Sequence, residues 1–208
     1  MALDALVSAF VTLLVVVDPI GLVPTFLAIT EGLPPKARQR VALRACLIAA
    51  TILTGAALAG DWLFTVLGIS LPAFRIAGGL LLFSIASEMV FGVRIERQSK
   101  AAEQAIEEHV RNVAAFPLAI PLMAGPGAIT ATVLLAGRTD GRPGALALLF
   151  GVICAVIAIC FAVYLAAERI GRLLGITGNV VLSRLLGVIL AALAVQYVLD
   201  GIRAVIAT

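Results

Sequence analysis

The sequence predicts an all-α polytopic membrane protein. We expect six transmembrane helices, arranged as two inverted three-helix repeats with broken first and fourth helices. Of the 208 residues, 62% are hydrophobic and 13% are charged, and the mean hydropathy is +1.14, whereas about a quarter of a soluble domain is charged. The sequence also contains repeated apolar stretches, each of about the 20 residues that a helix needs to cross a bilayer or longer. Finally, the two halves of the chain show the same order of features.

The apolar stretches define the predicted elements in order. They are residues 5–30, 41–60, 71–92, 112–136, 144–167 and 182–206. Because little of the chain lies outside them, we predict one membrane domain, 1–208, with 1–92 as the first repeat and 112–208 as the second. The N-terminal segment carries Asp4 where a signal peptide would be basic, so we expect it to be retained as part of the first helix.

The basic residues are unevenly divided between the two sides of the predicted membrane domain. The connections after the first, third and fifth spans hold Lys36, Arg38, Arg40, Arg44, Arg94, Arg97, Lys100, Arg111, Arg169, Arg172 and Arg184. The other side holds Arg75, Arg138, Arg142 and Arg203. The positive-inside rule then places the first set in the cytoplasm and both termini outside. No basic block indicates a nucleic acid partner.

The longest connection, 93–111, is polar and is predicted to be a cytoplasmic loop. Glu96 and Lys100 stand four residues apart, which favours a short surface helix, and His109, the only histidine, is predicted to be solvated. No Cys, His and Asp residues have the spacing of metal ligands, so neither a metal nor a cofactor is expected. The cysteines, Cys46, Cys154 and Cys160, lie in apolar segments and do not indicate a disulfide framework.

The two halves share motifs in the same order. VLGISLPAFRIAGGLLLFSIASEMVFG (66–92) parallels LLGITGNVVLSRLLGVILAALAVQYVLDG (173–201), and VVVDPIGLV (15–23) parallels LMAGPGAIT (122–130). The matched positions are Arg75 with Arg184, Gly78 with Gly187, Gly92 with Gly201 and Pro19 with Pro126. Three spans per unit is an odd number, so the second unit must cross the membrane in the opposite direction. Many secondary transporters have this plan, with the substrate site where broken helices meet.

The first span contains a carboxylate and three helix breakers in VVVDPIGLVP. If the helix starts near residue 4, Asp18 lies about 20 Å along it at a rise of 1.5 Å per residue, a depth at which an unpaired charge costs several kcal/mol. Pro19, Gly21 and Pro24 disrupt the helix there. Two interpretations stay open: Asp18 caps a half-helix that begins at Pro19, or it also binds a substrate or a coupling cation.

The fourth span has the corresponding break in AIPLMAGPGAITATVLLAG. Pro121, Gly125, Pro126 and Gly127 interrupt it, and a second half-helix is predicted from Pro126, with Thr130 one turn further. Its free amides and positive dipole end would favour a carboxylate; the alternative is a kink that serves only packing. Together the two breaks indicate a zwitterionic ligand.

Other polar residues lie in corresponding stretches of the third and sixth spans. Ser84, Ser87 and Gln196 are possible pathway residues, although such side chains also serve as hydrogen-bonding groups between helices. Ser70 with Pro72 indicates a helix start, and Gly78, Gly79 and Gly187 are expected to allow close helix packing.

Three blocks, VVDPIGLVPTFLAIT, LGISLPAFRIAGGLLLF and FPLAIPLMAGPGAITA, resemble the signature blocks of the MarC family, also called the six-helix neutral amino acid transporter family. The resemblance covers nearly the whole chain. It implies a bacterial or archaeal inner-membrane protein that transports small neutral amino acids such as glycine and alanine, and an older association with antibiotic resistance also points to drug export. The residues it nominates are Asp18, Pro19, Gly21, Pro24, Thr25, Gly125, Pro126, Gly127 and Thr130. The family is similar in plan to amino acid exporters of the lysine-exporter superfamily, so the direction of transport stays open.

The resulting hypothesis is a secondary transporter of small neutral amino acids, coupled to H⁺ or Na⁺, that works by alternating access. We expect Asp18 to bind the ammonium group or the coupling ion, and the half-helix at Pro126 to bind the carboxylate. The alternatives are an exporter of amino acids, other small solutes or drugs, and a non-transporting regulatory subunit of the membrane. We do not predict an enzyme, because no catalytic constellation is present, and no Walker motif indicates ATP drive. A homo-oligomer is possible, because six short spans leave little room to enclose a site.

Overall fold

The computed structural model describes residues 3–107, 114–139 and 141–206. The helices are α1 (Leu3–Val17), α2 (Val23–Ile29), α3 (Pro35–Leu67), α4 (Leu71–Phe91), α5 (Val93–Glu107), η1 (Ala114–Met123), α6 (Pro126–Gly137), α7 (Pro143–Leu165) and α8 (Ala167–Ile206). The described chain is helical almost throughout, which confirms the predicted all-α class. The segment η1 is irregular, because Phe116 and Ile120 have extended backbone, the conformation favoured for residues that precede a proline.

Four helices within the described residues are long and apolar enough to cross a membrane. They are Pro35–Gly60, Leu71–Phe91, Pro143–Leu165 and Thr177–Ile206. The segments η1 and α6, bent by 56° at the break between them, form a fifth candidate. The predicted first span, 5–30, is not identified as one, because its apolar helix ends at Val17 and the chain turns there. At 1.5 Å per residue, 15 residues reach only about 22 Å. The number of six spans therefore stays a prediction.

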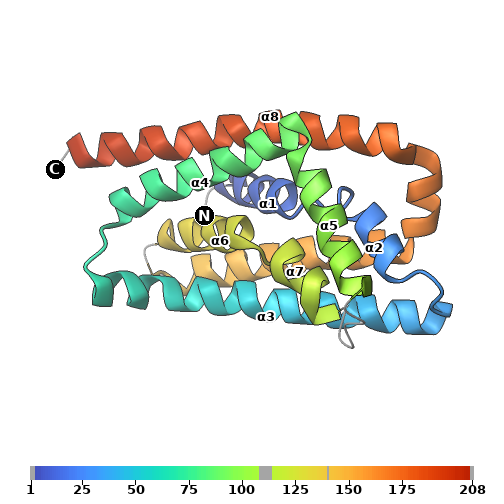
Figure 1. Cartoon of the computed structure of the whole chain (residues 1–208). Coiled ribbons are helices and arrows are strands. Elements are labelled where there is room, and N and C mark those ends of the chain that lie inside the picture. Colours follow the sequence, from blue (N-terminus) through green and yellow to red (C-terminus); the bar gives the residue numbers. More distant parts are fainter. Residues whose placement is uncertain (1–2, 108–113, 140, 207–208) are drawn as a thin grey trace.

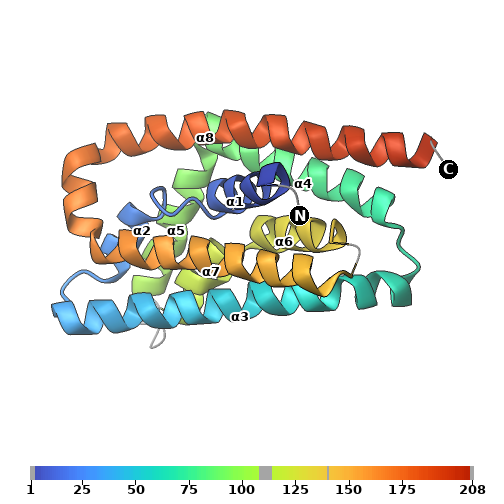
Figure 2. The same cartoon turned by 180° about the vertical axis from the view of Figure 1, so that it is seen from behind.

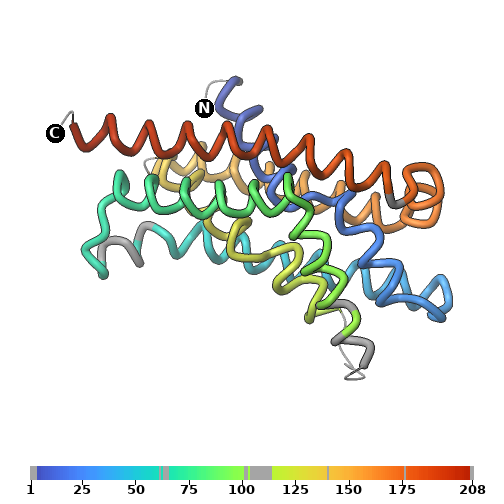
Figure 3. Tube along the Cα trace, turned by 45° about the horizontal axis from the view of Figure 1, so that its top comes forward, coloured from blue at the N-terminus to red at the C-terminus, as the bar shows by residue number. Residues whose placement is uncertain are grey.

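The long helices form two pairs, with the broken segments between them (Figure 1). Helices α4 and α8 lie side by side along one side of the molecule, and α3 and α7 lie along the other. In the view of Figure 2 the short helices α1 and α6 lie between these pairs, although the first turn of α1 is exposed. Both ends of the described chain lie toward the end of the molecule at which α3 passes to α4 (Figure 3).

Small residues bring α4 and α8 together, and this pair has the most extensive packing in the molecule. A Cβ atom added to Gly79 would lie 2.7 Å from the backbone oxygen of Ala194, and one added to Gly187 would lie 3.1 Å from that of Ala86. Similarly, a Cβ at Gly201 would lie 2.9 Å from the Pro72 oxygen. These close approaches confirm the packing role predicted for the glycines.

The glycines of the two LGI motifs both have positive φ. Gly68 (φ 65°) precedes the start of α4, and Gly175 (φ 59°) bends α8, and glycine adopts such positive φ values without strain. The side chain of Ser70 caps α4 as predicted, since its hydroxyl accepts a hydrogen bond from the Ala73 amide at 3.3 Å. The third helix of each half therefore begins after a similar turn.

Each broken segment packs against the long helices of the other half of the chain. Helices α1 and α2 contact α7 and α8, whereas η1 contacts α3, and α6 contacts both α3 and α4. The two halves are therefore interlocked rather than placed side by side.

The structure corrects the expectation for 93–111. Residues Val93–Glu107 form the helix α5, so the predicted helix is confirmed to that point, but one of its faces is not solvated. The side chains of Arg94 (6% exposed) and Gln98 (4% exposed) are buried. Four residues apart, they lie on the same face of α5, which packs against α2 and α4. His109, which is predicted to be solvated, lies outside the described residues.

We predict that Gly79→Ala destabilises the protein by about 1–3 kcal/mol, because the new methyl group overpacks the α4–α8 contact. The matched control is Gly151→Ala, since a Cβ at Gly151 meets nothing within 4 Å and alanine favours a helix more than glycine does. Thermal unfolding in detergent, followed by circular dichroism, should give a lower midpoint for the first variant only. Equal midpoints would contradict the packing role of Gly79.

Candidate functional site at the two helix breaks

The first break is a tight turn built on Asp18. This residue has φ 53°, a conformation that aspartate tolerates better than most side chains. The Gly21 amide donates a hydrogen bond to Asp18 Oδ1 at 3.0 Å. A Cβ at Gly21 would lie 2.1 Å from Asp18 Oδ2, so the turn requires glycine there.

The capping role predicted for Asp18 is wrong in its position. The following helix, α2, begins at Val23 with Leu22 as its N-cap residue and has no side-chain cap, so no half-helix begins at Pro19. Asp18 does make a capping bond, because its Oδ1 atom accepts from the Gly21 amide and its carbonyl accepts from the Leu22 amide at 3.2 Å. Residues 18–22 form a turn, however, and the regular helix starts only after it.

The Asp18 carboxylate lies inside the protein, with 1% of the residue exposed. The Ser183 hydroxyl of α8 donates a long hydrogen bond to Asp18 Oδ2 at 3.4 Å. The buried guanidinium of Arg94 is close enough for the two charges to attract each other. A carboxylate and a guanidinium therefore share one buried region, and each reduces the cost of burying the other.

Arg94 also satisfies the end of α1. Its Nη2 atom donates to the Val16 carbonyl at 2.7 Å, and its Nη1 atom contacts Met89 Sδ at 3.3 Å. The break at Pro19 leaves carbonyls at the end of α1 without helical partners, and a cation is favourable at a helix C-terminus. The sequence did not indicate this role, because Arg94 lies in a polar segment whose charges are expected to be solvated in the cytoplasm. Its four-residue spacing from the uncharged Gln98 was the available signal of a buried face.

The second break forms at the predicted place. Gly125 is the N-cap residue of α6, which begins at Pro126 and has no side-chain cap. The amides of Gly127 and Ala128 therefore point out of the first helical turn without a side-chain partner. A Cβ at Gly127 would lie 2.4 Å from Ile85 Cδ1 and 3.3 Å from Val16 Cγ1, so the missing side chain lets this helix end approach both α4 and α1.

A pocket of about 360 Å³ lies at the second break, beside the last turn of α1, and none of the residues of the first break, 18–22, lines it. Its lining includes the start of α6 and side chains of α4 and α5: Ser84, Glu88, Arg94, Arg97, Gln98, Pro121, Gly125, Pro126, Gly127 and Ala128. Val16, two residues before Asp18, also lines it. An ion pair between Arg97 and Glu88, at 2.9 Å, forms part of its wall. The helix N-terminus and the two arginines make the pocket favourable for an anionic group. The Glu88 carboxylate, by contrast, would attract a cationic group.

The structure places the other predicted residues as follows. Pro19 is buried in the turn, and Thr25 is buried in α2. Pro24 lines a separate groove of about 480 Å³ between α2 and α8. Thr130 is buried in α6, where a Cβ at Gly78 would lie 2.9 Å from Thr130 Cγ2.

Two of the possible pathway residues lie elsewhere. The hydroxyl of Ser87 donates to the Phe83 carbonyl within α4. Gln196 donates to Asp200 Oδ1 at 2.7 Å, in a cluster where Asp200 also pairs with Arg138 at 3.1 Å. Of the three predicted pathway residues, the pocket contains only Ser84. Among the described residues, no group of His, Cys, Asp or Glu side chains is arranged to hold a metal ion.

Comparison with known proteins identifies the family. The model of the MarC family integral membrane protein matches residues 3–206. A UPF0056 membrane protein of Aquifex aeolicus is 38% identical, over 95% of this chain and 92% of its own length. The UPF0056 membrane protein MJ1677 of Methanocaldococcus jannaschii is 36% identical, with 98% of each chain covered. The UPF0056 membrane protein YhcE of Escherichia coli is 33% identical, over 94% of this chain and 91% of its own.

These three relatives are named as membrane proteins, in both bacteria and archaea, and none of the three has the name of an enzyme. No solved structure matches the chain. Since the family model covers almost every residue, and relatives above 30% identity align with nearly their whole length, the chain belongs to the MarC family of integral membrane proteins.

Proposed function

We propose that this membrane protein is a secondary transporter of small neutral amino acids, coupled to H⁺ or Na⁺. The observation that carries the proposal is the pocket at the start of α6, in which a helix N-terminus without a side-chain cap lies beside the buried Arg94. The charge of Arg94 is in turn attracted to the buried Asp18. Arg94 of the ligand site therefore interacts electrostatically with Asp18, the candidate coupling group.

The pocket fits a small zwitterion in size and charge. Its volume of about 360 Å³ is near the lower end of the range of ligand pockets. The substrate carboxylate would accept hydrogen bonds from the Gly127 and Ala128 amides and from Arg94, and Glu88 would face the ammonium group. The hydroxyl of Ser84 would orient the ligand, and the volume is sufficient for glycine or alanine.

Coupling follows from the position of Arg94 between two anions. When Asp18 is ionised, it competes with the substrate carboxylate for the field of Arg94. When a cation neutralises Asp18, Arg94 loses its counter-charge and binds the substrate carboxylate more strongly. Because such linkage is reciprocal, substrate binding also strengthens cation binding at Asp18, which is the condition for cotransport.

The proposed architecture is the inverted repeat, and matched contacts support it. A Cβ atom added to Gly92 would lie 3.8 Å from Arg184 Nη2, and one added to the matching Gly201 would lie against Pro72 and Ile76, on either side of Arg75, the match of Arg184. The positive φ values of Gly68 and Gly175 also coincide. Alternating access would then exchange the environments of the two breaks. We place the protein in the bacterial or archaeal inner membrane, with both termini outside and with a homo-oligomer as a possible assembly.

The pocket favours transport over a non-transporting regulatory subunit, since a subunit that only assembles with partners does not need a cationic pocket at a helix break. The alternative is that the same mechanism exports its substrate instead of taking it up, and that the substrate is an amino acid, another small solute or a drug.

The first prediction concerns the wild-type protein reconstituted in liposomes. Radiolabelled glycine or alanine should accumulate when a proton or sodium gradient is imposed and should not accumulate after the gradient is collapsed with an ionophore. Counterflow from preloaded vesicles tests the export direction. Absence of movement of both amino acids under every gradient and in both directions would remove the substrate proposal.

Asp18→Asn should abolish gradient-driven accumulation, because an amide cannot change its charge. Substrate exchange without a gradient should persist, since Arg94 is then free of its counter-charge. Asp4→Asn, the same chemical change at an exposed position of α1, serves as the matched control and should accumulate substrate normally. Accumulation by Asp18→Asn at the wild-type level would contradict the coupling role.

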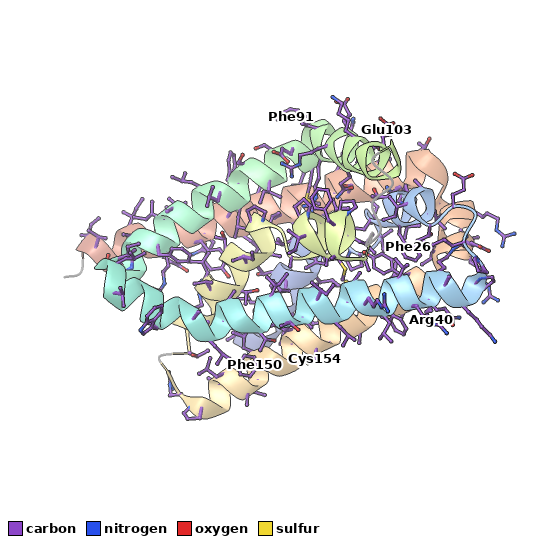
Figure 4. All side chains as sticks on the ribbon, turned by 60° about the horizontal axis from the view of Figure 1, so that its bottom comes forward. Phe26, Arg40, Phe91, Glu103, Phe150 and Cys154 are labelled. Atoms are coloured by element: carbon purple, nitrogen blue, oxygen red, sulfur yellow. The ribbon has the colours of Figure 1, made fainter. Side chains whose placement is uncertain are left out.

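Arg94→Lys should raise the KM for glycine about tenfold or more, because hydrogen bonds to charged groups contribute roughly 1.5–3 kcal/mol and lysine lacks the planar fork of arginine. The control is Arg40→Lys, since Arg40 is exposed on α3, away from the pocket (Figure 4). Initial uptake rates over a range of glycine concentrations give both KM values. An unchanged KM in the Arg94 variant would exclude Arg94 from the ligand site.

A further inference from the structure

A second cavity, the α2–α8 groove, approaches Asp18 from another side. It has a volume of about 480 Å³ and is lined by α2 residues such as Val23 and Pro24 and by α8 residues such as Leu174 and Asn179. Glu168 and Arg172 also belong to its lining, and the Glu168 side chain is 64% exposed. The groove has no lining residue in common with the pocket at the start of α6.

One polar side chain in this groove is buried without a partner. Asn179 is 5% exposed, and its Oδ1 atom has no hydrogen-bond partner among the described residues. An unpaired buried amide oxygen costs about 1–3 kcal/mol, which a bound water molecule would recover. Asn179 therefore marks a polar position in an otherwise mainly apolar wall.

Asn179 and Ser183 are four residues apart on α8 and so lie on one face of the helix. Ser183 is 2% exposed, and its hydroxyl is the group that donates to Asp18 Oδ2 at 3.4 Å. The polar atoms thus follow one another from the groove to the carboxylate, first Asn179, then Ser183, then Asp18.

We propose that the α2–α8 groove is the route by which protons reach Asp18, with Asn179 and Ser183 as its two relay positions. This rests on the proposed coupling role of Asp18 and assigns the proton as the coupling ion. Asn179 Oδ1 holds a water molecule in place. A hydronium ion in the groove gives a proton to the water molecule held by Asn179, this water gives a proton to the Ser183 oxygen, and the Ser183 hydroxyl proton passes to Asp18 Oδ2. Water, an intact serine and a neutral carboxyl group result.

The surroundings of Asp18 favour a proton over Na⁺. A sodium ion needs several oxygen ligands, yet Asp18 Oδ1 already binds the Gly21 amide. Within the described part of the chain, Cys160 and Tyr164 of α7 also interact with Asp18, and both are neutral in their protonated forms. A proton neutralises the carboxylate without a ligand cage.

The test follows the protonated Asp18 carboxyl group directly, without requiring transport. In infrared difference spectra of the reconstituted protein, we expect a buried carboxyl band that is absent from Asp18→Asn and that shifts on transfer to D₂O. The rate of this shift should fall by about tenfold or more in Ser183→Ala and Asn179→Leu, as expected when a proton-transfer group is removed. Ser183→Thr keeps the hydroxyl and should exchange at close to the wild-type rate.

The control variant is Thr51→Val, which removes an exposed hydroxyl that bonds only within α3; it should leave the exchange rate unchanged. A carboxyl band that exchanges equally fast in Ser183→Ala and Asn179→Leu would overturn the route, as would a wild type with no Asp18 band at any pH at which it stays folded. Uptake assays on the same samples separate the two proposals. Slow exchange in the two variants without uptake by the wild type would sustain the route and reject the transporter, whereas uptake with unaltered exchange would do the reverse.

Discussion

The structure depends on the joint burial of Asp18 and Arg94. Alone, either charge would cost several kcal/mol in the interior of a membrane protein, and the break at Pro19 also leaves carbonyls of α1 without helical partners. One guanidinium reduces each of these costs in part, because it attracts the carboxylate and donates to the Val16 carbonyl at 2.7 Å. The start of α5 must therefore lie within reach of the end of α1, although the composition of α5 is that of a solvated segment.

Glycine determines how closely the two breaks approach each other. Gly21 allows the chain to turn around the Asp18 carboxylate, and Gly127 allows the start of α6 to approach Val16 and Ile85. Larger side chains would hold these segments apart and fill the space between them. At the second break, Gly125, Pro126 and Gly127 both interrupt the helix and line the pocket.

The sequence predicted what depends on local chemistry. Proline and glycine located both breaks, Ser70 located the start of α4, and the LGI motifs located the turns before the third helix of each half. It did not predict the burial of Arg94, because a rule about average charge cannot identify one arginine that pairs with a distant carboxylate. Gln196 and Ser84 were both predicted to be pathway residues because they occupy similar stretches of the two halves. In an antiparallel pair of helices, such positions lie at opposite ends, and Gln196 bonds Asp200 there.

The interlocking of the halves has a consequence for how the protein is made. When residues 1–92 leave the ribosome, the helices that will cover α1 and α2 have not been synthesised, since α7 and α8 lie at the end of the chain. Asp18 therefore enters the bilayer before Ser183 exists to bond it. The helices of the first half are therefore inserted in the membrane before they can pack against α7 and α8. The two halves complete their packing together, late in synthesis. Neither half is an independently folding unit, even if both descend from one ancestral segment.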